Sequence, residues 1–170
     1  MTTLLNWNHI VVPQRQYTGC IPTGYEWLVR YLNIQGVNLG TFQKDFDLGQ
    51  SNSFNSVAAK IRSKYPFISI QIQSFTKGID KVKLVKSLID AQTPCLISLA
   101  LGKGKGWHIM PVVRIDDTIV EMIHHADANG NHTWKFPIRT IIWRHDNLQG
   151  GNDISWIDST QSSKRTPCTQ

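Results

Sequence analysis

Cys20 and His108 are the two residues whose types and settings predict covalent chemistry. Cys20 follows the polar segment 14–19 and precedes Pro22, which suits the first turn of a helix because it has no backbone N–H. A thiol at a helix N-terminus faces backbone N–H groups, and these favour the thiolate. His108 begins an apolar segment typical of a strand, where an imidazolium could pair with that thiolate. The two side chains together predict nucleophilic acyl transfer.

Gln14 lies six residues before Cys20 and carries a side-chain amide that could lie beside the Cys20 backbone N–H. Two such donors would form the oxyanion hole that acyl transfer requires. Gln16 is the alternative donor if the loop is wound differently.

The other two cysteines are expected to have no catalytic role. Cys95 lies in the apolar run 94–101, which favours a small buried thiol, and Cys168 lies in a polar C-terminal segment. Three widely spaced cysteines without a CxxC or CxxH pair exclude a disulfide framework and a zinc finger.

His124 and His125 are adjacent and invite interpretation as metal ligands. Neighbouring residues of a strand point to opposite faces, so these two imidazoles are not expected to share an ion. The sequence therefore predicts no metal and no cofactor.

The elements that must position these residues follow from apolar spacing and from Pro and Gly. Helices are predicted from Pro22 to about Gly36, over 54–65 after Ser51 or Ser53, and around 82–89 with a cap near Asp80. Strands are predicted at 10–12, 68–73, 95–101, 107–115 and 118–125, with a two-residue turn at 116–117 and a short element at 138–144. The strand at 95–101 should be central, and Pro111 should mark an edge position or a bulge.

Helices come first and an antiparallel sheet follows, so the fold class is α+β. We expect a single domain over 1–158 and a disordered tail over 159–170.

The order of Gln14, Cys20, a helix, an apolar strand, a Gly-rich loop, His108 and a hairpin resembles the papain-like cysteine peptidases, and most closely the C39-type family. The resemblance covers roughly residues 11–127. It implies a papain-like fold and a cysteine peptidase in which Cys20 attacks, His108 transfers protons and Gln14 holds the oxyanion. Ile21 stands where the family usually has glycine, and its side chain either crowds the substrate or packs inward.

The family also implies an Asp or Asn that orients the histidine from the end of the next strand. A two-residue hairpin turn sets His108 opposite His125, with Asp127 two residues further on the same face. A bulge at Pro111 would bring His124 to that face instead. We assign Asp127 to the role because a carboxylate stabilises the imidazolium, with His125 as the alternative.

Composition narrows the partners. Eighteen Lys and Arg against twelve Asp and Glu give a formal charge of +6 over 170 residues, but the basic residues are scattered, so no specific nucleic-acid partner is expected. The chain has no apolar run of membrane-spanning length and no secretory signal at its start, which predicts a cytoplasmic protein. A peptide or protein substrate is the expected partner. The alternatives are a non-catalytic peptide- or protein-binding module of the same fold, and an acyltransferase or deamidase that uses the same triad.

Overall fold

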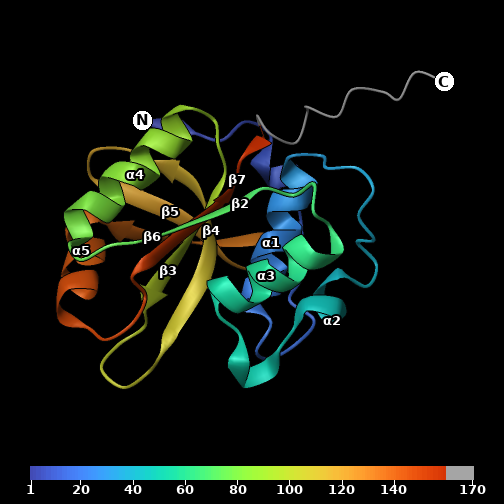
Figure 1. Ribbon diagram of the computed structural model, residues 1–170. Coiled ribbons are helices and arrows are strands. Elements are labelled where there is room, and N and C mark those ends of the chain that lie inside the picture. Colours follow the sequence, from blue (N-terminus) through green and yellow to red (C-terminus); the bar gives the residue numbers. More distant parts are fainter. Residues whose placement is uncertain (160–170) are drawn as a thin grey trace.

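The computed structural model describes residues 1–159 and has one antiparallel sheet between two groups of helices (Figure 1). In the described residues the strand order is β2-β7-β3-β4-β5-β6, and the short strand β1 pairs with β4. The strands are β1 (Thr2–Thr3), β2 (Ile70–Ser74), β3 (Cys95–Ala100), β4 (Trp107–Ile115), β5 (Ile119–Asp127), β6 (Gly130–Pro137) and β7 (Asp153–Ile157). The prediction of an α+β fold with a central strand at 95–101 is confirmed, since β3 is buried along its whole length.

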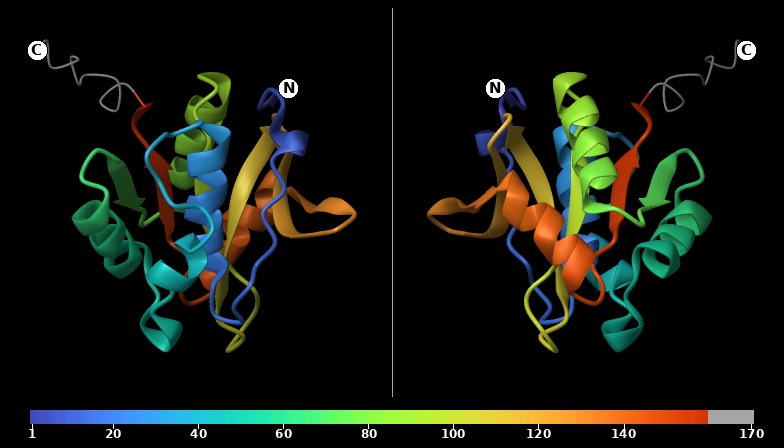
Figure 2. Two further views of the ribbon diagram at one scale, coloured as in Figure 1. Left: turned by 90° about the vertical axis from the view of Figure 1, so that its right-hand side faces the viewer. Right: turned by 90° about the vertical axis from the view of Figure 1, so that its left-hand side faces the viewer.

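Helices cover both faces of the sheet. They are α1 (Cys20–Tyr31), α2 (Phe42–Phe46), α3 (Phe54–Lys64), α4 (Gly78–Asp90) and α5 (Ile138–Asn147), with 3₁₀ turns η1 (Trp7–His9) and η2 (Gly49–Ser51). Figure 1 shows α1, α2 and α3 on one side, and Figure 2 shows α4 and α5 in front of the strands on the other. Among the described helices, none combines the length and the apolar character needed to cross a membrane.

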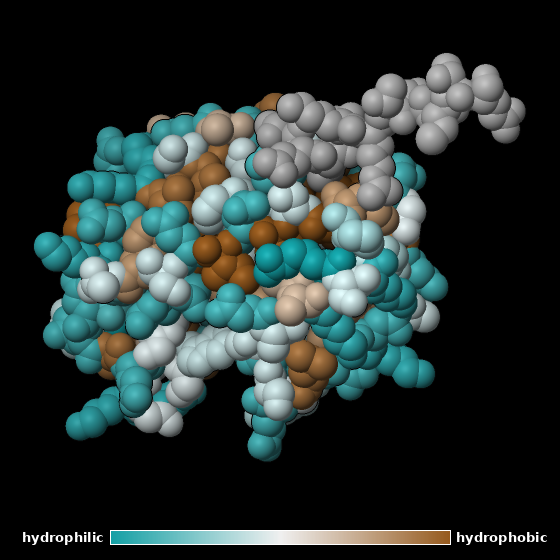
Figure 3. All heavy atoms as spheres, in the orientation of Figure 1, coloured by the Kyte–Doolittle hydropathy of each residue, from teal (hydrophilic) through white to brown (hydrophobic). Residues whose placement is uncertain are grey.

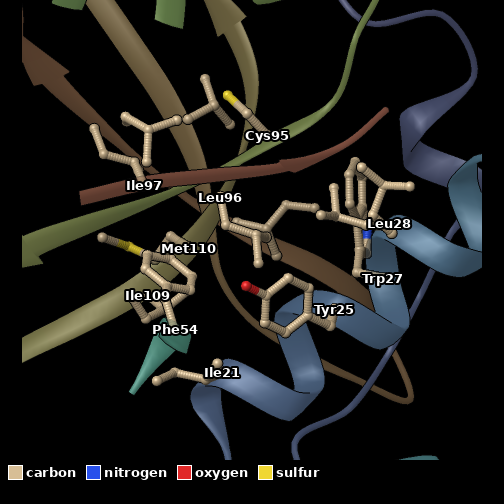
Figure 4. Close-up of a cluster of buried hydrophobic side chains, with 14 of the residues drawn as sticks. Ile21, Tyr25, Trp27, Leu28, Phe54, Cys95, Leu96, Ile97, Ile109 and Met110 are labelled. Atoms are coloured by element: carbon tan, nitrogen blue, oxygen red, sulfur yellow. The ribbon is translucent and has the colours of Figure 1, made fainter. Parts of the chain in front are cut away.

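Packing of α1 against the sheet determines where Cys20 lies. A Cβ atom at Gly24 would come within 3.0 Å of both Leu96 Cδ atoms, so only glycine lets the helix approach β3 this closely. The hydroxyl of Tyr25 shares a 2.7 Å hydrogen bond with Ser155 on β7. Figure 4 shows Leu96 and Tyr25 in one cluster, with Cys95 pointing away from α1. The start of α1 is thereby fixed against the sheet.

A buried lysine joins α4 to the other side of β3. Lys81 is fully buried, and its Nζ donates hydrogen bonds of 2.5 Å to the carbonyl oxygens of Ser98 and Gly151. Gly151 has a φ of +70°, and a Cβ atom there would lie 2.5 Å from the backbone nitrogen of Ala100. The turn that precedes β7 is therefore held directly on β3.

Several predicted elements have the expected position. Helix α3 begins where expected, because the Ser53 hydroxyl accepts from Ser56 N and the Ser56 hydroxyl accepts from Ser53 N, each at 3.0 Å. The segment 10–12 is not a strand, and α4 begins after Lys77 rather than being capped by Asp80. The element expected at 138–144 is helix α5, whereas α2, β6 and β7 were not predicted.

The β4–β5 hairpin differs from the predicted two-residue turn. Ile115 pairs with Val120, so the loop has four residues. The Asp116 carboxylate accepts 2.8 Å hydrogen bonds from the backbone N–H groups of Thr118 and Ile119, which favours the longer turn.

Pro111 is not on an edge, because β4 lies between β3 and β5. The register shift of β4 against β5 falls between Val112 and Arg114, not at Pro111. The expected tail at 159–170, with Cys168, lies outside the described residues except for Ser159.

Candidate active site

Cys20 and His108 line the same pocket although 88 positions separate them in the sequence. Cys20 is the first residue of α1, and His108 is the second residue of β4, opposite Leu99 of β3. The pocket is narrow, about 30 Å³, and its other lining residues include Gln14, Trp27, His124 and His125. Gly24 also lines it, so the close contact of α1 with the sheet places Cys20 in the same pocket as His108.

A backbone carbonyl orients the ring of His108. Its Nε2 lies 3.2 Å from the carbonyl oxygen of His124. Because a carbonyl only accepts hydrogen bonds, Nε2 must carry the proton, and Nδ1 of the neutral ring is left with its lone pair. The neutral histidine is therefore held in the tautomer that can accept a proton at Nδ1.

Asp127 does not occupy the position that the sequence predicted for it. Within residues 1–159 its carboxylate bonds to His132 Nε2 at 2.9 Å and to the backbone N–H of Asn129 at 2.7 Å, and not to His108. The prediction that Asp127 orients His108 is wrong for this structure, and so is the alternative that His125 does.

The register explains the error. In the described chain β4 and β5 pair only from Val112 onward, and a second shift on β5 lies between Ile123 and His125. This second shift is a β-bulge, which leaves His124 without an opposite residue on β6 and turns its carbonyl to His108.

The same bulge overturns the expectation that His124 and His125 point to opposite faces. His125 Nδ1 lies 2.6 Å from His124 Nε2, so the two rings meet on one side of the hairpin. Strict alternation of side chains holds only where a strand is regular.

Burial disfavours the charged forms of both groups in the pocket. It raises the pKa of the Cys20 thiol above its ordinary value of 9.0, and hydrogen bonds from the backbone of Ile109 and Ile21 oppose this only partly. Burial also lowers the pKa of His108 below 6.5, against the opposing effect of the His124 carbonyl. Near pH 7 both shifts therefore favour a thiol and a neutral imidazole over the predicted thiolate and imidazolium.

Gln14 lines the pocket, but its amide is engaged in its own loop. Its Nε2 donates to the carbonyl oxygens of Gln16 (2.6 Å) and Tyr17 (3.0 Å). The Gln16 side chain, the alternative oxyanion donor, belongs to an exposed residue that does not line this pocket.

Gln43 holds this loop, and sequence reasoning missed it. Its side chain is buried, accepts a 2.8 Å bond from Arg15 N and donates a 2.9 Å bond to Pro13 O, so both neighbours of Gln14 are fixed. Its Nε2 also donates to the buried carboxylate of Glu26, which pairs with Arg30. The sequence signal is limited to the spacing of Phe42 and Phe46, which places Gln43 on a short helical turn.

Ile21 packs inward. It is fully buried, and Figure 4 shows it near Phe54 at the start of α1. Its side chain therefore leaves the pocket free. Of the two alternatives for this position, crowding the substrate or packing inward, the structure has the second.

A second, larger cleft has Trp107, the residue before His108, in its lining. Ser53 and Phe54 line one side and Trp107 and Gly150 the other, around a volume of about 280 Å³. Figure 3 shows the surface hollowed at the lower edge, between the β3–β4 connection and the segment around η2. Trp107 is 39% exposed, so its indole forms part of the wall of this cleft.

Comparisons with solved structures identify the fold. One similar structure is a C39-like peptidase from Bacillus anthracis, with 12% sequence identity, a TM-score of 0.63, and coverage of 93% of this chain and 98% of the other. Another is a double-glycine motif protease from an AMS/PCAT transporter in complex with the leader peptide, with 13% identity, a TM-score of 0.53, and coverage of 92% and 97%. The chain thus has a C39-type papain-like peptidase fold. No family model and no curated protein matches the sequence.

Proposed function

We propose that this protein is a cysteine peptidase that hydrolyses an amide bond of a peptide or protein through an acyl-enzyme on Cys20. The proposal rests on the meeting of Cys20 and His108 in one pocket of a C39-type fold, at the start of a helix and the start of a strand. A thiol beside a general base is the arrangement that covalent acyl transfer needs.

In the first step the Cys20 sulfur attacks the substrate carbonyl carbon, and its proton passes to Nδ1 of His108. The carbonyl π electrons move to oxygen, which becomes an oxyanion. The first backbone N–H groups of α1 have no partner within the helix, so the Cys20 N–H can donate to this oxygen. Gln14 supplies the second donor by releasing one of its two loop carbonyls.

The intermediate collapses when the imidazolium of His108 gives its proton to the leaving nitrogen. The C–N bond breaks, the amine departs, and the acyl group remains on sulfur as a thioester. His108 then takes a proton from water as the water attacks the thioester. The carboxylic acid leaves, and the proton returns to the Cys20 sulfur.

The His124 carbonyl takes the orienting role that the sequence assigned to Asp127. It fixes the ring and the tautomer of His108 through the 3.2 Å contact with Nε2. A neutral carbonyl stabilises an imidazolium less than a carboxylate does, in keeping with the neutral resting pair.

The cleft beside Trp107 is suited to hold the peptide on one side of the scissile bond. It is larger than the pocket, and the two are lined by consecutive residues of β4, Trp107 and His108. An indole wall offers apolar contact, and the polar groups of Ser53 and Asp153 offer hydrogen bonds.

The test is digestion of a peptide library of diverse sequence by the protein and by Cys20→Ala, with new termini identified by mass spectrometry. We expect new termini that disappear in Cys20→Ala and in His108→Gln. Cys95→Ala is the matched control, because this thiol is buried away from the pocket.

Termini formed equally by Cys20→Ala, or none at all, would contradict peptidase activity. A Cys20-dependent mass change on glutamine side chains without new termini would assign deamidation or acyl transfer instead. Capture of intact peptides by both proteins would favour the binding module.

A further inference from the structure

We propose that the end of the β5–β6 hairpin is a binding site for a divalent transition-metal ion of the zinc type, with His125, Asp127 and His132 as ligands. One ligand atom from each residue lies within 4.8 Å of the others. The inference is independent of the proposed peptidase activity.

The register of the hairpin places the three side chains on one face. His125 lies directly opposite His132 on β6, and Asp127 lies two residues after His125 on β5. No shift interrupts the ladder between His125 and Asp127, so alternation keeps these two side chains on the same side. The cross-strand pair of His125 and His132, together with Asp127 two residues further along β5, therefore forms a compact set of three ligands.

The distances suit the ion after small side-chain movements. Three ligand atoms around Zn²⁺ lie about 3–3.5 Å apart if each is about 2.0–2.2 Å from the metal. The atoms of His132 and Asp127 are already 2.9 Å apart, and their side chains are 42% and 46% exposed, so both can adjust. His125 and His132 are stacked, with ring centroids 4.2 Å apart, and must tilt for their lone pairs to converge.

His124 supplies the outer support that a ligating histidine needs. His125 Nδ1 contacts His124 Nε2 at 2.6 Å, and His124 stacks on Trp134 with ring centroids 4.2 Å apart. When His125 Nδ1–H donates to His124, Nε2 of His125 is left with its lone pair for the metal. Metal-bound histidines commonly use their second nitrogen in this way.

The donor set selects the class of ion. Two imidazole nitrogens and one carboxylate favour zinc, copper or nickel over calcium and magnesium, which prefer oxygen ligands. Three protein ligands leave at least one position of a tetrahedral ion open to water.

The experiment is a calorimetric titration of the full chain with Zn²⁺, and an absorption titration with Co²⁺ as the spectroscopic probe. The parent carries Cys20→Ser and Cys168→Ser, so that neither thiol competes for the ion. We expect one equivalent of Zn²⁺ and Co²⁺ bands without sulfur-to-metal charge transfer.

The variants His132→Ala and Asp127→Asn should each weaken binding at least about tenfold, since loss of a ligand should exceed the effect of losing an outer partner. In Asp127→Asn the amide oxygen can still accept from Asn129 N, so the hairpin turn is kept, while the amide nitrogen replaces the oxygen that faces His132. The exposed His9, which lies on η1, is the control, and His9→Ala should bind like the parent.

Two results would overturn the proposal. One is the absence of one-to-one binding in the parent. The other is equal affinity in the parent and in the His132→Ala and Asp127→Asn variants, with thermal unfolding showing that all are folded.

Discussion

The pocket at the start of α1 and the interior between β3 and α4 impose the same electrostatic penalty on very different groups. In the pocket, burial raises the pKa of Cys20 and lowers that of His108. In the interior it raises the pKa of Cys95 to about 12 and lowers that of Lys81 to about 7. Desolvation disfavours charge in both places.

The two regions differ in access and in pairing. Cys20 is half-buried and shares a pocket with a base. Cys95 is fully buried, and within residues 1–159 its thiol makes no hydrogen bond to another side chain. Lys81 uses its ammonium to hold two carbonyl groups. A shifted pKa alone therefore does not distinguish a reactive group from a structural one. Two groups with shifted pKa values that line the same pocket are the stronger indication of a reactive site.

The largest expected difference is between the two thiols. Cys20→Ala should reduce hydrolysis by at least about 10⁴-fold, as loss of a nucleophile does, and leave unfolding almost unchanged. Cys95→Ser should keep activity and lower the free energy of unfolding by about 1–3 kcal/mol, because it buries a hydroxyl among apolar groups. Steady-state rates and denaturant titrations measure both, and equal activity loss in the two variants would remove the distinction.

His108→Gln should reduce kcat/KM by about 10²–10⁴-fold, the usual contribution of a general base. The active form holds one proton on the thiol–imidazole pair, so activity falls below the pKa of His108 and above that of Cys20. The directions of the two shifts predict a broad profile, with its acid limb below pH 6.5 and its alkaline limb above pH 9. An acid limb at about pH 4 together with an alkaline limb below pH 9 would instead indicate an ion pair, in which the imidazolium lowers the pKa of the thiol.

Alkylation compares the thiols without a substrate. Iodoacetamide should modify Cys20 at least about a hundredfold faster than Cys95, which reacts only after the chain opens. The Cys20 rate should rise with pH beyond 9, with no shoulder on the acid side. Mass mapping across pH 4–9.5 measures this, and an acid-side shoulder that His108→Ala removes would restore the thiolate–imidazolium pair.

Lys81 gives the smallest effect. Its folded pKa lies below that of the unfolded chain, so between about pH 7 and 10.5 the unfolded state binds more protons and stability rises with pH. Relative to Lys81→Met, the wild type should gain about 2 kcal/mol between pH 7 and pH 9. Chemical denaturation at several pH values measures the difference, and parallel pH curves for the two proteins would show a Lys81 with an ordinary pKa.

Local sequence features were enough to predict that Cys20 and His108 share one site. A proline after the cysteine sets a helix start, and an apolar run after the histidine sets a strand start. The partner of His108 could not be predicted in this way, because it depends on a four-residue turn and a bulge, each of which shifts the register. The role of Gln43 could not be predicted for a related reason, since its contacts join segments that only the tertiary fold brings together.

The acceptor that holds His108 has a consequence for genetics. It is the main-chain oxygen of residue 124, and every amino acid carries that atom. Under the proposed mechanism, a scan of side-chain substitutions should therefore identify Cys20 and His108 as indispensable and find no side chain that orients His108. The proposed catalysis therefore constrains the bulge that aims this carbonyl and places no demand on the side chain at position 124.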